Sequence, residues 1–335
     1  MNKFIYPTCA HTFREFYSKD KHIMFKYINK LKKVRPFDVT LRDGLQGLPK
    51  EEQVNMKSID KIRLYFFIKQ NYKPLNMEIG SIVSSKILPV FQDSSYIYNH
   101  IEYSLLDEEA YSLSEQKEVM PNNFILIPNQ TKFQDIDKFI GLSCFSFITS
   151  VSESFQMKNT KRSLTTTFQQ INNMIHNLET TSNQYKSNQY KSNTSKQYKT
   201  KIYVSCINEC PIEGKIPLLN IVTELFVLST MNVDRICLSD TCGTLTKVEF
   251  VDIIENTKKL GINTKIFSLH LHVKPEREDE VQEIVHAALD YGIEEFDVSY
   301  LKTGGCSLTI DKSELAPNMS YEQYYKFLTN YLLKN

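Results

Sequence analysis

An arginine and an aspartate stand side by side in the motif Asp38-Val-Thr-Leu-Arg-Asp-Gly-Leu-Gln46, directly after an apolar run that is typical of a strand. A carboxylate at the end of a strand can hold a divalent cation. A guanidinium beside it can stabilise an oxyanion that develops during a reaction. Arg42 and Asp43 are therefore candidate functional residues, although a strand followed by a polar turn at Gly44 would also explain this motif.

Two histidines, His270 and His272, are separated by one leucine near the end of another expected strand. Residues i and i+2 of a strand point to the same face. Both imidazoles can therefore reach one metal ion. The sequence leaves open the alternative that hydrogen bonds alone satisfy the two rings.

Three further residues could contribute to the same chemistry. Glu78 lies on an expected strand, and an acidic side chain inside a barrel needs a partner, for which Arg42 is the candidate. Asp240 stands at the end of another strand. Cys306 follows two glycines, which can form a loop mobile enough to carry a thiol over a site. The alternative is that these are ordinary turn residues.

Short β-rich runs alternate with longer helical stretches along the chain, which favours a parallel sheet built of βαβ units. The expected strands are Phe37–Leu41, Asn76–Val83, Phe124–Ile127, Cys144–Thr149, Lys201–Cys206, Arg235–Ser239, Ile266–His272 and Glu295–Ser299. The helical segments between them include Glu51–Gln70, Ser163–Leu178, Leu218–Met231, Lys247–Leu260 and Glu278–Tyr291. Eight strands in a chain of 335 residues favour a single-domain (β/α)8 TIM barrel over an open sheet. We expect an N-terminal extension over residues 1–34 and the barrel over residues 35–330.

The candidate residues all fall near expected carboxyl ends of strands, and a barrel gathers these ends at one mouth. One carboxylate and two imidazoles leave coordination positions open for substrate and water. This mixture of ligands suits Mg²⁺ or Mn²⁺, with Zn²⁺ as an alternative.

One segment interrupts the alternation of strands and helices. Residues 180–200 contain a tandem Ser-Asn-Gln-Tyr-Lys repeat and have almost nothing to bury. We expect a flexible surface insertion between the fourth helix and the fifth strand, on the face of the barrel away from the mouth.

Composition excludes several classes of protein. The 40 basic and 39 acidic side chains leave a net charge of +1, which argues against a nucleic-acid-binding protein. The sequence contains no run of 18 apolar residues, so we expect no membrane-spanning segment. The 7 scattered cysteines indicate a reducing compartment rather than a disulfide framework. We expect a cytoplasmic location, with the mitochondrion as the alternative.

The motifs, taken in order, resemble the 3-hydroxy-3-methylglutaryl-CoA lyase family, within the larger group of pyruvate carboxyltransferase-like barrels. The similarity runs from about Arg35 to about Leu328, apart from the repeat. The opening motif TLRDGLQ ends in Leu45-Gln46, as in the lyases rather than the related synthases. Other matching stretches are Glu78-Ile-Gly-Ser-Ile-Val-Ser84, Ile127-Pro-Asn129, Ser152-Glu-Ser-Phe-Gln-Met-Lys-Asn159, Tyr203-Val-Ser-Cys-Ile-Asn-Glu-Cys-Pro211, Ser239-Asp-Thr241 and Gly304-Gly-Cys306.

The resemblance implies a role for each matching residue. It implies a divalent metal held by Asp43, His270, His272 and Asn318. It implies that Arg42 stabilises an enolate oxygen, that Glu78 positions Arg42 and that Cys306 assists proton transfer. Gln46 and Asp240 would line the substrate pocket, and the substrate would be an acyl-CoA, cleaved to acetyl-CoA and acetoacetate.

The chain departs from the family pattern at two places. Val273-Lys-Pro275 stands where the family supports its metal-binding histidines, and the sequence after Cys306 also differs. Two alternatives to the lyase therefore stay open: a related aldolase or Claisen-type synthase, and a degenerate barrel that acts as a binding or scaffold protein. A homodimer is also left open.

Overall fold

The computed structural model describes residues 34–111, 121–188, 198–305 and 316–334, and in it eight parallel strands close into a barrel. The strands follow the order β1-β10-β9-β8-β5-β4-β3-β2 around the barrel. Their bounds are β1 Arg35–Asp38, β2 Asn76–Ser81, β3 Asn122–Leu126, β4 Cys144–Ser150, β5 Lys199–Ser205, β8 Arg235–Asp240, β9 Phe267–Leu271 and β10 Glu295–Val298. The expected (β/α)8 fold is therefore confirmed.

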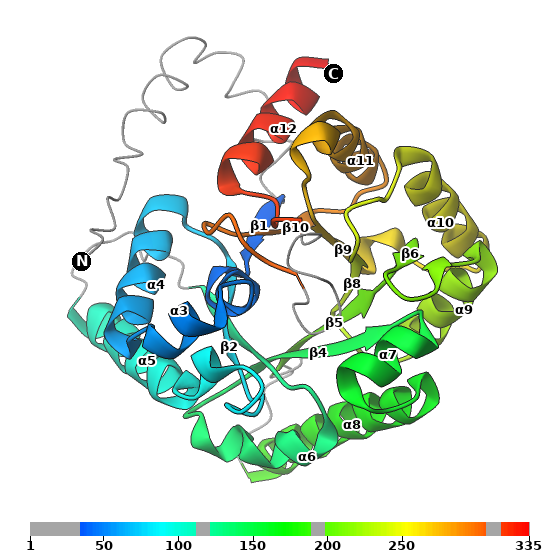
Figure 1. Cartoon of the computed structure of the whole chain (residues 1–335). Coiled ribbons are helices and arrows are strands. Elements are labelled where there is room, and N and C mark those ends of the chain that lie inside the picture. Colours follow the sequence, from blue (N-terminus) through cyan, green and yellow to red (C-terminus); the bar gives the residue numbers. More distant parts are fainter. Residues whose placement is uncertain (1–33, 112–120, 189–197, 306–315, 335) are drawn as a thin grey trace.

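Helices surround the strands as an outer ring (Figure 1). They are α3 Lys50–Asn55, α4 Ser58–Tyr72, α5 Ser94–Tyr111, α6 Gln130–Phe133, α7 Glu153–Thr160, α8 Leu164–Asn188, α9 Leu218–Ser229, α10 Lys247–Lys259, α11 Glu278–Asp290 and α12 Tyr321–Lys334. A small antiparallel pair, β6 Glu209–Cys210 and β7 Gly214–Lys215, lies in the connection after β5. No helix in the described part of the chain is long and apolar enough to span a membrane.

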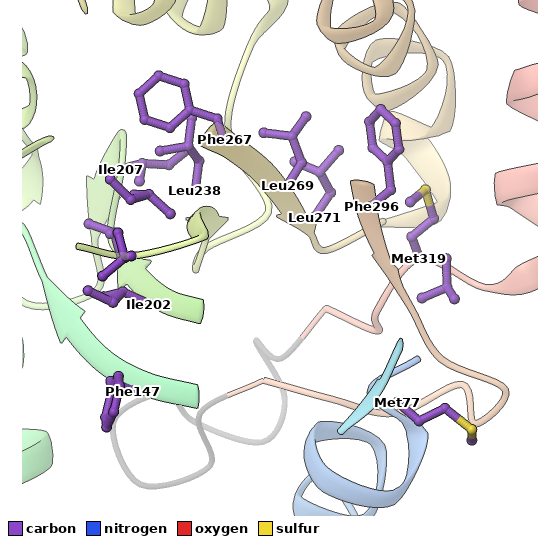
Figure 2. Close-up of a cluster of buried hydrophobic side chains, with 14 of the residues drawn as sticks. Met77, Phe147, Ile202, Ile207, Leu238, Phe267, Leu269, Leu271, Phe296 and Met319 are labelled. Atoms are coloured by element: carbon purple, nitrogen blue, oxygen red, sulfur yellow. The ribbon is translucent and has the colours of Figure 1, made fainter. Parts of the chain in front are cut away.

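Apolar side chains on the outer faces of the strands form the main core against the helices. Phe267, Leu269 and Leu271 alternate along β9 and belong to this core, together with Phe296 and Met319 (Figure 2). The period of two sends Ser268 and His270 to the opposite face, toward the barrel interior. Burial of each large apolar side chain contributes about 1.5–3 kcal/mol, and this anchors the strands that carry the polar residues inside.

Two of the expected elements differ clearly from the structure. The first strand ends at Asp38 rather than Leu41, because residues Thr40–Gly44 form a π-helical turn. The expected helix Glu51–Gln70 is two helices, since α3 ends at Asn55 and α4 begins at Ser58. Helices α5, α6, α7 and α12 were not among the helical segments that we named from the sequence.

The repeat segment is only partly the insertion that we expected. Helix α8 continues through the first copy of the repeat and ends at Asn188, and β5 begins at Lys199. Adding residues to a helix that is already anchored by its buried first half is easier than starting a new one, so α8 continues into this polar segment although Ser, Asn and Thr are weak helix formers. Residues 189–197 and nearly all of the expected N-terminal extension lie outside the described residues.

Candidate functional site

Asp43 and Arg42 are held on the π-helical turn that follows β1. The turn is fixed by a hydrogen bond from the Gly44 amide to the Val39 carbonyl, 3.0 Å long. All five residues of the turn are buried. Single π-type turns are rare and occur preferentially at functional sites. Here the extra residue per turn brings both charged side chains to the barrel mouth.

The Arg42 guanidinium connects two carboxylates. Its Nε donates to Oε2 of Glu78, and its Nη1 donates to Oδ1 of Asp43 at 2.6 Å. Tyr203 donates its hydroxyl to the same Glu78 oxygen at 3.1 Å, and its ring lies 4.9 Å from the guanidinium carbon. Within the described residues, the Arg42 Nη2 atom makes no hydrogen bond, so donors remain for a ligand in the adjoining pocket.

The two histidines meet at the same mouth, with their ring centroids 4.9 Å apart. His270 Nε2 lies 3.8 Å from Asp43 Oδ2, while its Nδ1 lies 3.0 Å from Asp297 Oδ2. His272 Nδ1 lies 2.8 Å from the Asp240 carbonyl oxygen. In each ring one nitrogen is therefore occupied by a hydrogen bond, which leaves Nε2 for the site.

Asn318 reaches the site from the segment before α12. An isolated antiparallel bridge pairs it with His272, and its side-chain amide donates to Asp43 Oδ2 at 2.9 Å. The Gly305 amide donates to the same oxygen at 3.0 Å. A Cβ on Gly304 would overlap the Asn318 amide, so this glycine allows the close approach of the two segments.

Two neighbouring protonation states favour a metal ion at this site. Burial opposes the charge of Asp43, but the adjoining Arg42 guanidinium and the hydrogen bond from the Gly305 amide favour it, and the Asp43 pKa is held well below its usual range. Burial lowers the pKa of His272 to about 4, so this ring is neutral at neutral pH. A carboxylate beside a neutral imidazole is the protonation state that metal binding requires.

The described residues fit a divalent cation. Asp43, His270 and His272 each offer one ligand atom, and these atoms lie within 4.8 Å of one another. His272 Nε2 and Asn318 Oδ1 are buried, yet neither has a hydrogen-bond partner in the described part of the chain. Buried polar atoms without a partner are costly, and a shared cation would satisfy both atoms.

A pocket of about 460 Å³ opens beside this cluster. Arg42, Asp43 and both histidines line it on one side. Gln46 also lines it, as expected of a substrate-binding residue. Apolar residues from several strand ends and loops form other walls, among them Ile87, Leu88, Leu126, Ile148 and Phe155.

One of the expected site residues differs from expectation, and another is not tested. Asp240 is buried, and its carboxylate accepts the amides of Thr244 and Leu245 at 3.0 and 3.1 Å instead of lining the pocket. It shapes the loop after β8 and orients His272 through its backbone carbonyl. Cys306 lies outside the described residues, so its expected place at the mouth stays a prediction.

Three functional candidates were missed by sequence reasoning: Lys201, Tyr203 and Asp297. Lys201 and Tyr203 alternate with apolar residues on β5, and Asp297 stands between Phe296 and Val298 on β10. The signal in the sequence was the alternation of polar with apolar residues along an expected buried strand, which places the polar side chains inside the barrel. Their importance depends on which neighbours the closed barrel brings to them, and the pattern of one strand does not contain that information.

Comparisons with known proteins find one relative by sequence. No protein-family model matches the chain. Mouse mitochondrial hydroxymethylglutaryl-CoA lyase is 26% identical over 275 residues, which are 82% of this chain and 73% of the mouse protein.

Solved structures of the same enzyme share the fold. The HMG-CoA lyase of Pseudomonas aeruginosa is 23% identical with a TM-score of 0.67, covering 90% of this chain and 87% of that chain. The lyase of Acinetobacter baumannii, solved with coenzyme A and 3-methylmalate, is 18% identical with a TM-score of 0.64, covering 89% and 84%. The resemblance to hydroxymethylglutaryl-CoA lyases that the motifs predict is therefore confirmed: the chain is similar to one such enzyme in sequence and to others in fold.

Proposed function

We propose that this protein is a metal-dependent carbon–carbon lyase that cleaves 3-hydroxy-3-methylglutaryl-CoA to acetyl-CoA and acetoacetate. One observation carries the proposal: Asp43, His270 and His272 converge within 4.8 Å, beside Arg42 and at the wall of the same pocket. A metal-ligand set next to a fixed guanidinium is the combination that this reaction needs.

The metal ligands would be Asp43, His270 and His272, with Asn318 Oδ1 as a fourth. The oxygen and imidazole donors suit Mg²⁺ or Mn²⁺. Such a cation would supply Lewis-acid polarisation of the substrate oxygens. The protein contributes the remaining control, because the hydrogen bonds to Asp297 and to the Asp240 carbonyl fix both imidazole rings.

Arg42 would stabilise the charge that develops when the carbon–carbon bond breaks. The tertiary hydroxyl loses its proton and becomes the keto group of acetoacetate. The electron pair of the broken bond moves onto the thioester fragment as an enolate, which then takes up a proton to give acetyl-CoA. A guanidinium already held by Glu78 and Asp43 needs no reorganisation to meet the enolate oxygen. We assign that protonation to Cys306 from the family resemblance alone.

The pocket chemistry supports an acyl-CoA substrate. Lys132, Lys161 and Arg162 are exposed or half-buried residues of its lining, where they can meet phosphate groups. The structure of the Acinetobacter relative contains coenzyme A.

The relative from mouse is named as mitochondrial, and for this chain we keep the cytoplasm as the expected compartment.

The main argument for a degenerate barrel is weaker than the sequence implied. Val273-Lys-Pro275 replaces the residues that support the metal ligands in the family. In this protein the support comes from β10 and from the β8 backbone, through Asp297 and Asp240. The altered segment therefore leaves His270 and His272 oriented.

The test is an assay of acetyl-CoA and acetoacetate release by the purified full-length protein. We expect equal amounts of both products with Mg²⁺ or Mn²⁺, and none after treatment with a chelator. Aldol cleavage of a 2-keto acid with no release from the acyl-CoA would favour the related aldolase. Metal binding without turnover of any of these substrates would favour the scaffold alternative.

A further inference from the structure

A lysine is buried inside the barrel, below the candidate metal residues. Lys201 on β5 is fully buried, and its ammonium group donates to Asp297 Oδ1 and, at 3.2 Å, to Glu295 Oε1. The ammonium lies 3.4 Å from the centroid of the Phe37 ring, which with Phe124 belongs to an apolar cluster of buried residues. A lysine desolvated in this way is stable only when it is well paired.

The ammonium group of Lys201 faces two carboxylates of opposite charge, those of Asp297 and Glu295. Burial disfavours the charged form of Lys201, but Asp297 and Glu295 outweigh it and raise the Lys201 pKa. The side chains of Lys201 and Asp297 are each 1% exposed, and the ammonium group lies directly against the carboxylate. The contact has the geometry of a buried ion pair.

Asp297 uses its two oxygens for different purposes. Oδ1 accepts from Lys201, and Oδ2 lies 3.0 Å from Nδ1 of His270. A carboxylate is purely an acceptor when ionised, so the proton of the His270 ring belongs on Nδ1. The lone pair of Nε2 then faces Asp43, 3.8 Å away. Two ligands of one cation, each about 2.0–2.3 Å from it, fit such a separation.

We propose that Lys201 is a positioning residue for the candidate metal centre: through its ion pair it holds the Asp297 carboxylate against Nδ1 of His270, and so aims His270 Nε2 at the metal position. Lys201 is not among the described residues that line the pocket, and its ammonium group pairs with Asp297 and Glu295. It would act on the site through Asp297. The inference rests on the metal site of the proposed function but not on the identity of the substrate.

The tautomer of His270 distinguishes the two possible roles of Lys201. If Lys201 served only the packing of the core, replacing it would leave the tautomer unchanged. In metal-free protein labelled with ¹⁵N-histidine, NMR distinguishes rings protonated on Nδ1 from rings protonated on Nε2. We expect His270 of the wild type to be the Nδ1–H form. Lys201→Met should give a mixture of both forms, because Asp297 loses the group that holds its orientation. Assignment of the signal comes from a His270→Gln variant.

Metal affinity is the second readout, measured by titration calorimetry with Mn²⁺ alone. Loss of an outer partner of a metal ligand typically weakens binding about 10–100-fold, and we expect this for both Lys201→Met and Asp297→Asn. Lys201→Arg should restore affinity and tautomer toward the wild type. Glu295→Gln is the matched control, since it removes the other carboxylate of Lys201 without touching Asp297, and both readouts should stay within about twofold of the wild type.

A folded Lys201→Met protein with an unchanged His270 tautomer and wild-type Mn²⁺ affinity would overturn the inference. If that variant does not fold, Lys201→Gln takes its place, because it keeps a hydrogen-bond donor but lacks the charge. Equal effects of Glu295→Gln and Lys201→Met would also contradict the proposal, because they would show a general packing effect. None of these measurements depends on turnover, so they remain decisive even if the protein proves inactive on acyl-CoA.

Discussion

At the scale of single residues, Arg42 is both the proposed catalytic group and the counter-ion of two buried carboxylates. Its partner Glu78 is fully buried, and the second Glu78 oxygen has no hydrogen-bond partner among the described residues. A substitution at Arg42 therefore affects stability as well as chemistry, and the two effects must be separated by experiment.

Arg42→Met should destabilise the protein by about 3–5 kcal/mol, because it leaves the Glu78 charge buried without its partner. Adding Glu78→Gln removes that charge and should recover most of the loss. Urea unfolding monitored by circular dichroism measures both variants. If the double variant is no more stable than Arg42→Met, the Arg42–Glu78 pair is not the source of the effect.

Asn318→Ala should weaken Mn²⁺ binding by about tenfold or more while the protein stays folded, because Oδ1 is the proposed fourth ligand. Asn208→Ala is a matched control: both asparagines are 3% exposed, and neither Oδ1 atom has a hydrogen-bond partner among the residues that the structure describes. Calorimetric titration of the two variants checks the prediction. Equal loss of affinity in both would remove Asn318 from the ligand set.

The sequence was sufficient for site residues whose role can be inferred from their spacing along one strand. His270 and His272 were found because period two on a strand places both rings on one face. Asp297 and Lys201 were missed because their pairing joins strands that are 96 positions apart in the chain. Only closure of the barrel brings β5 and β10 close enough for this contact.

At the scale of elements, the site depends on the turn after β1 and on the segment between β10 and α12. Strand positions were predictable from apolar β-rich runs, and all eight exist. The end of β1 was not predictable, because a π-helical turn has no clear sequence signal in Thr40–Gly44. The residues just after that turn meet the glycines after β10, since a Cβ on Gly47 would collide with the Gly304 backbone.

Gly304→Ala should displace Asn318 and the Gly305 amide, both of which donate to Asp43. We expect a loss of Mn²⁺ affinity together with a lower melting temperature. Gly261→Ala is the control, because Gly261 also has a positive φ of 80° but nothing lies within 4 Å of an added Cβ. It should cost only about 1 kcal/mol of backbone strain and leave metal binding unchanged. Loss of affinity in both variants would contradict this account of the segment.

At the scale of the whole molecule, the barrel interior buries ionisable side chains. One of them, Asp38, makes the stability of the protein depend on pH. Burial outweighs the hydrogen bonds from Thr40 and Tyr321 and raises the pKa of Asp38 to about 7. Between pH 4 and 7 the folded protein keeps a proton that the unfolded chain releases. The stability contributed by Asp38 is therefore complete below pH 4 and is lost as the pH rises through 7, by at most about 1.4 kcal/mol per unit.

Asp38→Asn removes this titration and should flatten the dependence of unfolding free energy on pH. We expect the free-energy difference between wild type and Asp38→Asn to shift against the wild type from pH 5 to pH 7 and to become constant above pH 8. Urea unfolding in the presence of a chelator, across that range, measures the difference. Parallel curves for the two proteins would show that Asp38 does not hold a proton in the folded state.

The central claim is that one site binds a metal and a guanidinium stabilises an enolate beside it. Parallel measurement of Mn²⁺ binding and acetyl-CoA release in wild type, Arg42→Met and Asp43→Ala tests this most directly. A guanidinium offers only donors and cannot be a ligand. We therefore expect Arg42→Met to keep its metal but to lose about 10²–10³ in rate or more, and Asp43→Ala to lose both. Equal turnover by wild type and Arg42→Met would contradict the account.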